Sequence, residues 1–580
     1  MPRKDKKDDE RTQLLNDEQD HHHNHHHQQQ EQQQQQHQHE HNHSQSQNSE
    51  SEDSDDDDDI KFINLQIKRI KNLPWYKKPS VYSIVFLIGL LTFSSSSAEG
   101  ARQSIIYSKA ENSSTSSYNP KSSDQAQLVA SFNQYLLVGT TFFSLIPIAK
   151  FGEISSIIGR KPFFIALIFS ITISRFLQFL VLNYNKDLKF KLLLFANYIS
   201  AISGSLSIIT PLSDSYITDF TLPKNRVYKL SLASASTFIG QTFGPIFGNF
   251  IVNLGNSGSK HGNFNALKFE IGILIILCIY VITLFPESRN PKAEKKSEQR
   301  LLDHAEEEEG TEINPKDDTE RNKIIFIEIL KSSINIIEPL KILTYPKKTA
   351  KISNKHRYEQ IKYVVMGLIL TYSIYQTLIF TLNQIVIQYG QYKFNWSADN
   401  ISYLLSIISI SRSISLVFIL PILEKTILKK WLGFKSLNYS FDMIEYILII
   451  LGLIVALLVF FAFFLSHTTF QFYLTAIFFS LDALIQPVFD STIIKFFPSV
   501  SNGSIYGSIT LFISLLNLIS PILITWIYKF SIFINLPNLI YLFYGIWMLI
   551  FIVIVYSCKR VLKLNGKTTD KELRKRIFQE

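Results

Sequence analysis

The chain has 580 residues, 46% of them hydrophobic, and carries a formal net charge of +9. Its two cysteines, Cys278 and Cys558, are too few for a disulfide framework and form no CxxC metal site. Because the sequence also contains no ATP-binding, hydrolase or nucleic-acid-binding motif, we predict that the chain is not an enzyme, and we expect no cofactor, no metal site and no nucleic-acid partner.

Residues 1–60 are a polar, low-complexity segment rich in His, Gln and Asp. A segment of this composition buries too little apolar surface to offset its chain entropy, so we expect a disordered tail. We interpret its His tract as compositional bias rather than a metal site. Glu10 precedes Leu14 and Leu15 at the spacing of an acidic dileucine motif, which resembles endosomal and lysosomal sorting signals and predicts a sorting adaptor as a partner.

After a basic collar at residues 61–79, apolar stretches dominate the chain. A hydrocarbon core about 30 Å thick needs about 20 apolar residues in a helix. Uninterrupted runs of this length predict membrane-spanning helices rather than the alternating strands of a barrel. The expected spans are 80–98, 127–149, 162–184, 191–217, 230–254, 267–286, 361–388, 400–423, 443–466, 470–493, 503–527 and 534–557.

A charged linker at 287–360 divides these spans into six and six. We therefore predict an N-terminal half at 61–286, a C-terminal half at 361–558 and a C-terminal tail at 559–580. Four charges interrupt the apolar stretch 324–343, which predicts an amphipathic helix at the membrane surface rather than a thirteenth span. The excess of Lys and Arg in the collar and in the connections on its side places both termini in the cytoplasm.

The loop between the second and third spans carries glycines and basic residues at a defined spacing. Gly152 and Gly159 permit a tight turn, and Arg160 and Lys161 follow directly. This order resembles the G-x-x-x-D-x-x-G-R-K/R signature of the major facilitator superfamily, in the loop where that family carries it. The chain has Ser156 where the family has an acid, so the usual contact of that acid with a neighbouring helix is not expected here, although Glu153 is nearby in the sequence.

The end of the fourth span adds to this resemblance. Tyr216 and Asp219, with Arg226 downstream, are similar to the family's Y-x-x-D-x-T segment, and Asp219 is the natural partner for Arg160. The resemblance implies a charge network that closes the cytoplasmic side of a transport path. We expect this inner gate to contain Gly152, Gly159, Arg160, Lys161, Asp214, Asp219 and Arg226.

The fifth span contains a stretch similar to the G-x-x-x-G-P-x-x-G segment of family exporters and some other members. Gly240, Gly244 and Gly248 are spaced four apart, and Pro245 follows the second of them. Small residues at this spacing let two helix backbones approach closely, and proline permits bending. The stretch predicts a packing seam, a hinge, or both.

The family resemblance implies a fold and a mechanism. The expected fold is an all-α integral membrane protein with twelve transmembrane helices in two six-helix halves, which rock around a central solute site. Two short segments, Tyr392–Ser397 and the stretch at Pro421, more weakly resemble the proton-coupled folate transporter and tetracycline-exporter branches of the family.

Ionisable residues inside the spans are the strongest local indication of a site, because a mid-membrane charge costs about 2.5–3.5 kcal/mol on the insertion scale. Arg412 and Asp482 lie near the middle of their spans, and we interpret them either as a structural ion pair or as a proton-binding carboxylate with its partner. Arg175 is expected to snorkel towards the outer interface. The residues that we expect along the solute and proton pathway are Glu99, Gln376, Asn383, Arg412, Asp482 and Gln486.

The sequence therefore predicts a secondary active transporter of a small organic solute that works by alternating access and is coupled to protons. Its expected partners are the solute, protons and the lipid bilayer, and its expected location is the endosomal or lysosomal membrane or the plasma membrane. Two alternatives stay open. One is an exporter of lipophilic compounds, and the other is a membrane sensor or scaffold that has a transporter fold and moves no solute.

Overall fold

The computed structural model describes residues 56–74, 77–114, 122–185, 187, 189–254, 260–291, 294–295, 299, 302, 338–346, 355–396 and 398–563. Within these residues the regular structure is helical, and no strand occurs. The chain divides into two units, Met1–Phe62 and Ile63–Glu580. The dileucine at Leu14 and Leu15, most of the predicted surface helix at 324–343, and the tail beyond 563 lie outside the described residues.

Helix α2 (Asp56–Lys71) begins inside the segment that we expected to lack structure. Its first four residues are aspartates. Further along the helix, Ile63 is buried, and Gln66 Nε2 donates a hydrogen bond to the Ser288 carbonyl oxygen at 3.0 Å. Helix α2 therefore runs across the predicted boundary at residue 60.

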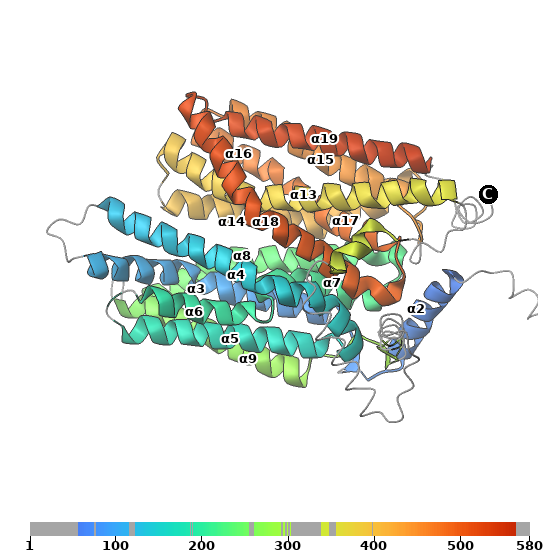
Figure 1. Ribbon diagram of the computed structural model, residues 1–580, viewed down its shortest axis with the longest axis horizontal. Coiled ribbons are helices and arrows are strands. Elements are labelled where there is room, and N and C mark those ends of the chain that lie inside the picture. Colours follow the sequence, from blue (N-terminus) through green and yellow to red (C-terminus); the bar gives the residue numbers. More distant parts are fainter. Residues whose placement is uncertain are drawn as a thin grey trace, which may run out of the picture. The chain divides into compact units, whose positions relative to one another are not determined.

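The N-terminal half is a bundle of long helices (Figure 1). Apolar runs form each of them, and the fourth span is built from two helices joined by a 3₁₀ segment. In chain order the elements are α3 (Val81–Ser114), α4 (Ser122–Ile158), α5 (Lys161–Tyr184), α6 (Phe190–Ala201), η2 (Ser205–Ile208), α7 (Ile209–Asp219), η3 (Pro223–Asn225), α8 (Arg226–Leu254) and α9 (Lys260–Thr283).

The C-terminal half repeats this plan after the short 3₁₀ segment η4 (Glu338–Thr344). Its fourth span is again interrupted by a 3₁₀ segment, and its second span continues as π-helix. The elements are α13 (Lys355–Phe394), α14 (Ala398–Ile414), η5 (Ser415–Ile419), η6 (Ile422–Trp431), α15 (Met443–Leu465), α16 (Thr469–Phe479), η7 (Ser480–Leu484), α17 (Ile485–Ile494), η8 (Ser499–Ser501), α18 (Asn502–Phe533) and α19 (Leu539–Leu562).

Eleven stretches of the described helices are long and apolar enough to cross a membrane. The remaining predicted span is α8, whose 29 residues reach about 43 Å at 1.5 Å per residue. Its hydroxyl-bearing residues, among them Ser231, Ser236 and Thr242, lower its apolarity but are buried against other helices. We therefore count α8 as the twelfth span, because its polar residues face protein instead of lipid.

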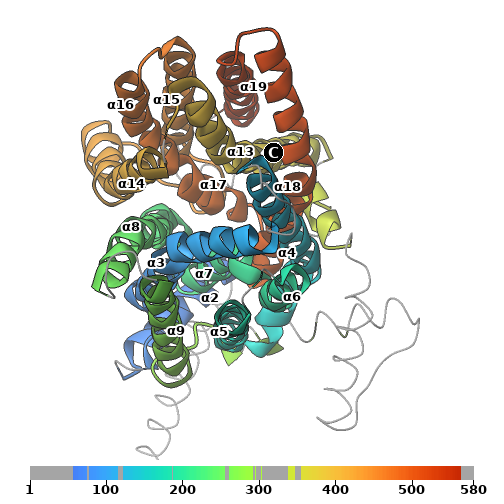
Figure 2. The same cartoon turned by 90° about the vertical axis from the view of Figure 1, so that its left-hand side faces the viewer.

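The two halves touch through α4 and α18 and through α8 and α14, which lie side by side in Figure 2. The approach of α4 to α18 is very close, since a Cβ atom on Gly152 would lie 2.1 Å from the Gly503 carbonyl oxygen. Gly507, one turn along α18, faces Phe151. These contacts lie at the end of the bundle where the loop between α4 and α5 emerges, so the halves are packed together at that end.

Candidate functional site

A buried charge network surrounds the loop between α4 and α5. Gly159 has a φ of 103° and makes the turn that brings Arg160 inside, where its side chain is fully buried. Arg160 Nε lies 3.1 Å from Asp219 Oδ2, and Arg289 Nη1 lies 3.4 Å from Asp219 Oδ1. Ser288 Oγ donates to Asp219 Oδ2 at 3.0 Å. Asp219 thus binds the start of α5, the end of α7 and the segment after α9 together.

Glu287 holds the same region through backbone hydrogen bonds. Its carboxylate accepts from the N–H groups of Arg160 at 3.0 Å and Lys161 at 2.8 Å, at the start of α5. It also accepts from the N–H groups of Ser288 and Arg289 at 2.8 and 2.9 Å. A carboxylate at a helix start satisfies free N–H groups and the helix dipole at once.

Arg289 was not among the predicted gate residues, because the sequence gives no reason for a residue after the sixth span to turn inward. Burial lowers the pKa of its guanidinium to about 10, with Asp219 opposing the shift and Arg160 adding to it. The group therefore stays charged at neutral pH. The neighbouring predicted gate residue Arg226 is also buried, and its Nε donates to the Thr221 carbonyl oxygen at 3.1 Å.

Neither Ser156, at the position of the family's acid, nor the nearby Glu153 joins this network through its side chain, although the Ser156 carbonyl oxygen accepts from Arg289 Nε at 3.2 Å. Ser156 Oγ donates to the Glu153 carbonyl oxygen at 2.7 Å, and the Glu153 carboxylate lies 3.4 Å from Lys150 Nζ. The hydroxyl that does reach Arg160 is that of Ser155. Ser156, which replaces the family's acid, therefore uses its hydroxyl group for a local contact within the end of α4.

The C-terminal half has a counterpart with the signs reversed. Lys495, directly after α17, lies 3.1 Å from Asp442 Oδ2 and 2.8 Å from Glu445 Oε1 at the start of α15. Burial lowers the pKa of Lys495, but the two carboxylates outweigh it and raise the pKa above its ordinary value. In each half, an ion pair therefore ties the end of the broken fourth span to the start of the third.

Asp214 and Asp490 occupy the same position in α7 and α17, each three residues after a proline. Both are buried, and their carboxyl groups interact electrostatically with each other across the two halves. Tyr506 of α18 donates from its hydroxyl to the Asp490 carbonyl oxygen at 3.2 Å. Tyr372 of α13 hydrogen-bonds the Asp490 carboxyl group. The predicted gate residue Asp214 thus faces an acid, and no basic partner is recorded for either acid in the described part of the chain.

The structure brings Arg412 and Asp482 together as a two-pronged ion pair. Arg412 Nη2 and Nε lie 3.0 and 3.3 Å from the two oxygens of Asp482, and Tyr375 Oη donates to Asp482 Oδ2 at 3.3 Å. The guanidinium also lies over the rings of Phe238 and Phe479, at 5.4 and 5.5 Å. Because Phe238 belongs to α8, the pair adjoins the interface between the halves.

The uncharged pathway candidates do not contact this ion pair directly in the described structure. Gln376 Nε2 donates to Tyr372 Oη at 3.1 Å, so it reaches the Asp490 region instead. Asn383 is exposed and shares a narrow, mostly apolar cavity with Arg412. Gln486 is half-buried.

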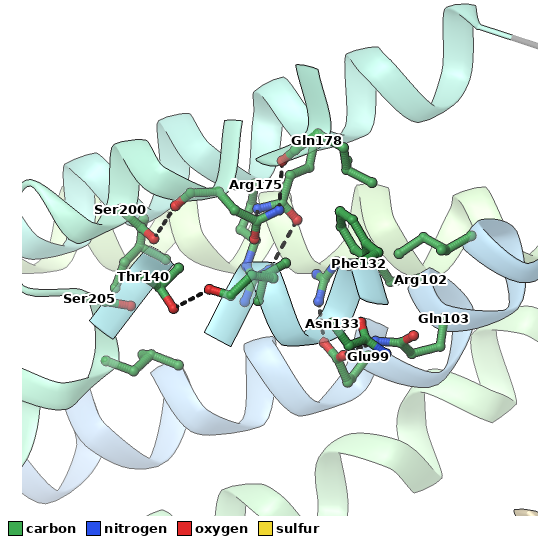
Figure 3. Close-up of a pocket in the computed structure, with 16 residues that line it drawn as sticks. Glu99, Arg102, Gln103, Phe132, Asn133, Thr140, Arg175, Gln178, Ser200 and Ser205 are labelled. Atoms are coloured by element: carbon green, nitrogen blue, oxygen red, sulfur yellow. Dashed lines mark hydrogen bonds and ion pairs between the residues drawn. The ribbon is translucent and has the colours of Figure 1, made fainter. Parts of the chain in front are cut away.

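A polar pocket of about 170 Å³ lies within the N-terminal half, between α3, α4, α5 and α6 (Figure 3). Glu99 and Arg102 enter it from α3, and Arg175 enters it from α5. Arg102 pairs with both Glu99 and Glu270, and Arg175 Nε lies 3.2 Å from Glu270 Oε1. The expectation that Arg175 snorkels was wrong, because Glu270 on α9 gives its charge a partner inside the bundle.

Arg102 and Glu270 were missed for a simple reason. The first span was predicted to end at residue 98, but α3 continues to Ser114 and carries Arg102 into the bundle. The i, i+3 spacing of Glu99 and Arg102 on one helix was the signal that could have found this pair.

The glycine stretch of α8 packs against α3. A Cβ atom on Gly240 would lie 2.1 Å from Thr92 Oγ1, and one on Gly248 would lie 1.8 Å from the Ser97 carbonyl oxygen. On Gly244 a Cβ atom would lie 2.7 Å from Ser96 Cβ. Pro245 sits within the same helix without ending it. The stretch is therefore a packing seam within the N-terminal half.

Comparisons with known proteins agree with this architecture. A family model described as Major Facilitator Superfamily matches residues 81–438. An uncharacterised membrane protein of Saccharomyces cerevisiae is 22% identical over 417 residues, covering 71% of this chain and 72% of that protein. The MFS-type transporter avaJ of Aspergillus versicolor is 23% identical over 218 residues, covering 36% of this chain and 38% of that protein.

Solved structures share the fold at low sequence identity. The human organic anion transporter MFSD10 has a TM-score of 0.55 and 14% identity, with 83% of this chain and 100% of that chain covered. The proton:xylose symporter XylE has a TM-score of 0.53 and 14% identity, with 83% of this chain and 96% of that chain covered.

Proposed function

Because the chain belongs to the major facilitator superfamily and is an integral, multi-pass membrane protein, we propose that it moves a small organic solute by alternating access, coupled to protons. The observation that carries the coupling is the buried ion pair of Arg412 and Asp482. A charged pair at mid-membrane costs desolvation energy that apolar residues would not, so it indicates a functional site.

Asp482 is the proton-binding group in this mechanism. Binding of a proton neutralises its carboxylate and weakens its hold on the guanidinium of Arg412. Arg412 is then free to leave the pair, and loss of the proton on the other side restores it. Asp482 lies on η7, in the break of the tenth span, and its partner Arg412 contacts Phe238 of α8 in the other half. This position suits a group that responds when the halves move.

Alternating access also needs a gate. We propose that the network around Arg160 and Asp219, with the close approach of Gly152 to Gly503, is the closed cytoplasmic gate. The basic collar at 61–79 supports this orientation, because Lys and Arg accumulate on the cytoplasmic side. The dileucine at Leu14 and Leu15 would then face cytoplasmic sorting adaptors and direct the protein to endosomes or lysosomes.

Flux into proteoliposomes tests the proposal. Vesicles that contain the full chain receive a proton gradient and the low-molecular-weight fraction of a cell extract, and mass spectrometry identifies the trapped compounds. We expect gradient-driven uptake of at least one solute. Asp482→Asn should abolish the gradient dependence while the protein stays in the membrane, and the exposed loop variant Asp187→Asn should transport normally.

The outcomes separate the rival functions. Normal gradient dependence in Asp482→Asn would refute the coupling role of Asp482. Wild-type protein that binds a compound without trapping any would instead be a sensor or scaffold. Extrusion of lipophilic dyes from loaded vesicles would identify an exporter. The glycine seam of α8 does not by itself identify one, because some family members that are not exporters have a similar stretch.

A further inference from the structure

The polar pocket of the N-terminal half lies where the fourth span is broken. At the start of η2, Gly204 and Ser205 have φ values of 92° and 56°, and Ser205 lines the pocket. A serine rarely adopts this left-handed conformation, and such strain collects at functional sites. Within a membrane, irregular backbone persists where it is buried in protein or lines a cavity. The break is therefore independent evidence, beside the charges, for a ligand site.

The pocket wall offers one accessible charge of each sign. The Glu99 side chain is 51% exposed, with its carboxylate held by Arg102 and by Gln103 Nε2 at 3.0 Å. The Arg175 side chain is 17% exposed, and its Nη1 donates to Gln178 Oε1 at 3.1 Å. Arg102 and Glu270, which link these two groups, are almost fully buried. The four charges sum to zero, so the pocket has no net preference for an anion or a cation.

The rest of the wall is made for hydrogen bonding to a small solute. The volume of about 170 Å³ is well below the roughly 300–1,000 Å³ of sites for drug-sized ligands, so the pocket is too small for a lipid or a drug-sized molecule. Apart from the charged groups and Ser205, the polar side chains on the wall are Gln103, Asn133, Thr140, Gln178, Asn197 and Ser200.

We propose that this pocket binds a small zwitterion of the α-amino-acid type, with its carboxylate on Arg175 and its ammonium group on Glu99. The proposal rests on the transport function proposed above and names its substrate class. An anion would be repelled by Glu99 and a cation by Arg175. An uncharged sugar would cover both charges without pairing with either, which costs desolvation energy.

Binding to the purified full chain in lipid nanodiscs tests the inference without requiring transport. Each of a panel of α-amino acids is titrated by calorimetry, together with its decarboxylated amine, its N-acetyl derivative, and xylose as an uncharged control. We expect at least one amino acid to bind, and both of its analogues to bind at least about tenfold more weakly. Glu99→Gln and Arg175→Gln should each weaken binding about tenfold or more, and the exposed variant Lys191→Gln should not.

The half-exposed position of Glu99 keeps the test decisive even if Arg175→Gln, which leaves Glu270 without one partner, fails to fold. An amine or N-acetyl analogue that binds as well as the amino acid would overturn the inference, as would tight binding of xylose that survives Glu99→Gln. No binding by any amino acid would overturn it as well. Amino-acid binding without flux in the proteoliposome assay would refute the transport function but not the site. Flux of another solute class without amino-acid binding would refute the site but not the transport function.

Discussion

At the scale of single residues, the pairing of Arg412 with Asp482 has a stability consequence. A buried ion pair gains little over apolar residues, but removal of one partner leaves an unpaired buried charge and costs about 3–5 kcal/mol. We expect Asp482→Asn and Arg412→Met each to lower the stability of the purified protein strongly. The double variant should recover most of the loss, because it leaves no unpaired charge.

Chemical unfolding in a mild detergent measures this as a double-mutant cycle, with Asp187→Asn as the exposed control. Residues in contact couple by about 0.5–3 kcal/mol. Strictly additive losses in the double variant would mean that the two side chains do not depend on each other for stability.

Residue positions within the spans could be predicted, but their partners only in part. Arg412 and Asp482 both lie at mid-span, and charged groups inside a membrane pair with each other, so their contact could be predicted. Arg175 and Glu270 are 95 positions apart, and nothing in the local pattern connects them. Asp219 was matched with Arg160 through the family resemblance, but its second cation, Arg289, follows the sixth span and gave no signal. Partner choice depends on tertiary packing, which hydropathy does not contain.

At the scale of elements, hydropathy located the spans, because crossing a bilayer sets the length and polarity of a helix directly. It did not locate the helix ends, since helices continue past the lipid once water or protein can cover their polar side chains. α3 is the clearest case, reaching Ser114 instead of residue 98. The breaks at Ser205–Ile208 and Ser480–Leu484 also escaped prediction, because apolar residues continue through them.

The seam between α3 and α8 gives a prediction for a whole helix pair. On Gly248 a Cβ atom would lie 1.8 Å from a backbone oxygen of α3, which cannot move without its helix. Gly248→Ala should therefore cost more than the about 1–3 kcal/mol of ordinary overpacking. Gly272 of α9 is a matched control, because a Cβ atom there meets nothing within 4 Å.

Size-exclusion chromatography after stepwise heating compares the two alanine variants. We expect a clearly lower apparent melting temperature for Gly248→Ala, and no loss for Gly272→Ala, where alanine also favours the helix. Equal melting temperatures would show that α3 and α8 can separate at no cost, contrary to a rigid seam.

At the scale of the whole molecule, the pair of Asp214 and Asp490 links the opening of the halves to pH. The acids belong to opposite halves, and both are buried where the halves are packed together. Burial disfavours the charged form of both acids, and two carboxylates that interact also repel each other, so the closed arrangement favours a proton on at least one of them. Separation of the halves would expose both acids to water, where both ionise. Closing should therefore take up a proton, and low pH should favour the closed state.

Among the residues that the structure describes, no cation is paired with Asp214 or Asp490. Tyr506 and Tyr372 present hydroxyl groups to the pair from α18 and α13. The basic and acidic groups on the adjoining elements interact elsewhere. Arg226 of α8 contacts the Thr221 carbonyl oxygen, and Lys495 at the end of α17 pairs with the acids of α15. Lys229 of α8 donates to Thr221 Oγ1 at 3.2 Å, and the acids Asp219 on α7, Glu445 on α15 and Asp482 on η7 are held in ion pairs.

Spin labels on the exposed residues Lys224 and Lys435, one in each half at this end, report the opening as a change in their distance. The labels are attached to the cysteines of Lys224→Cys and Lys435→Cys, in a chain whose native Cys278 and Cys558 have been replaced. For uptake of one proton, the ratio of closed to open molecules should fall by up to about tenfold per pH unit as the pH rises. Asp214→Asn/Asp490→Asn should stay closed at every pH, because the amides carry no charge and can hydrogen-bond each other, and Asp187→Asn should respond like the wild type. An unchanged pH response in the double variant would place the linked proton elsewhere, and its loss in Asp482→Asn alone would place it on the ion pair of the tenth span.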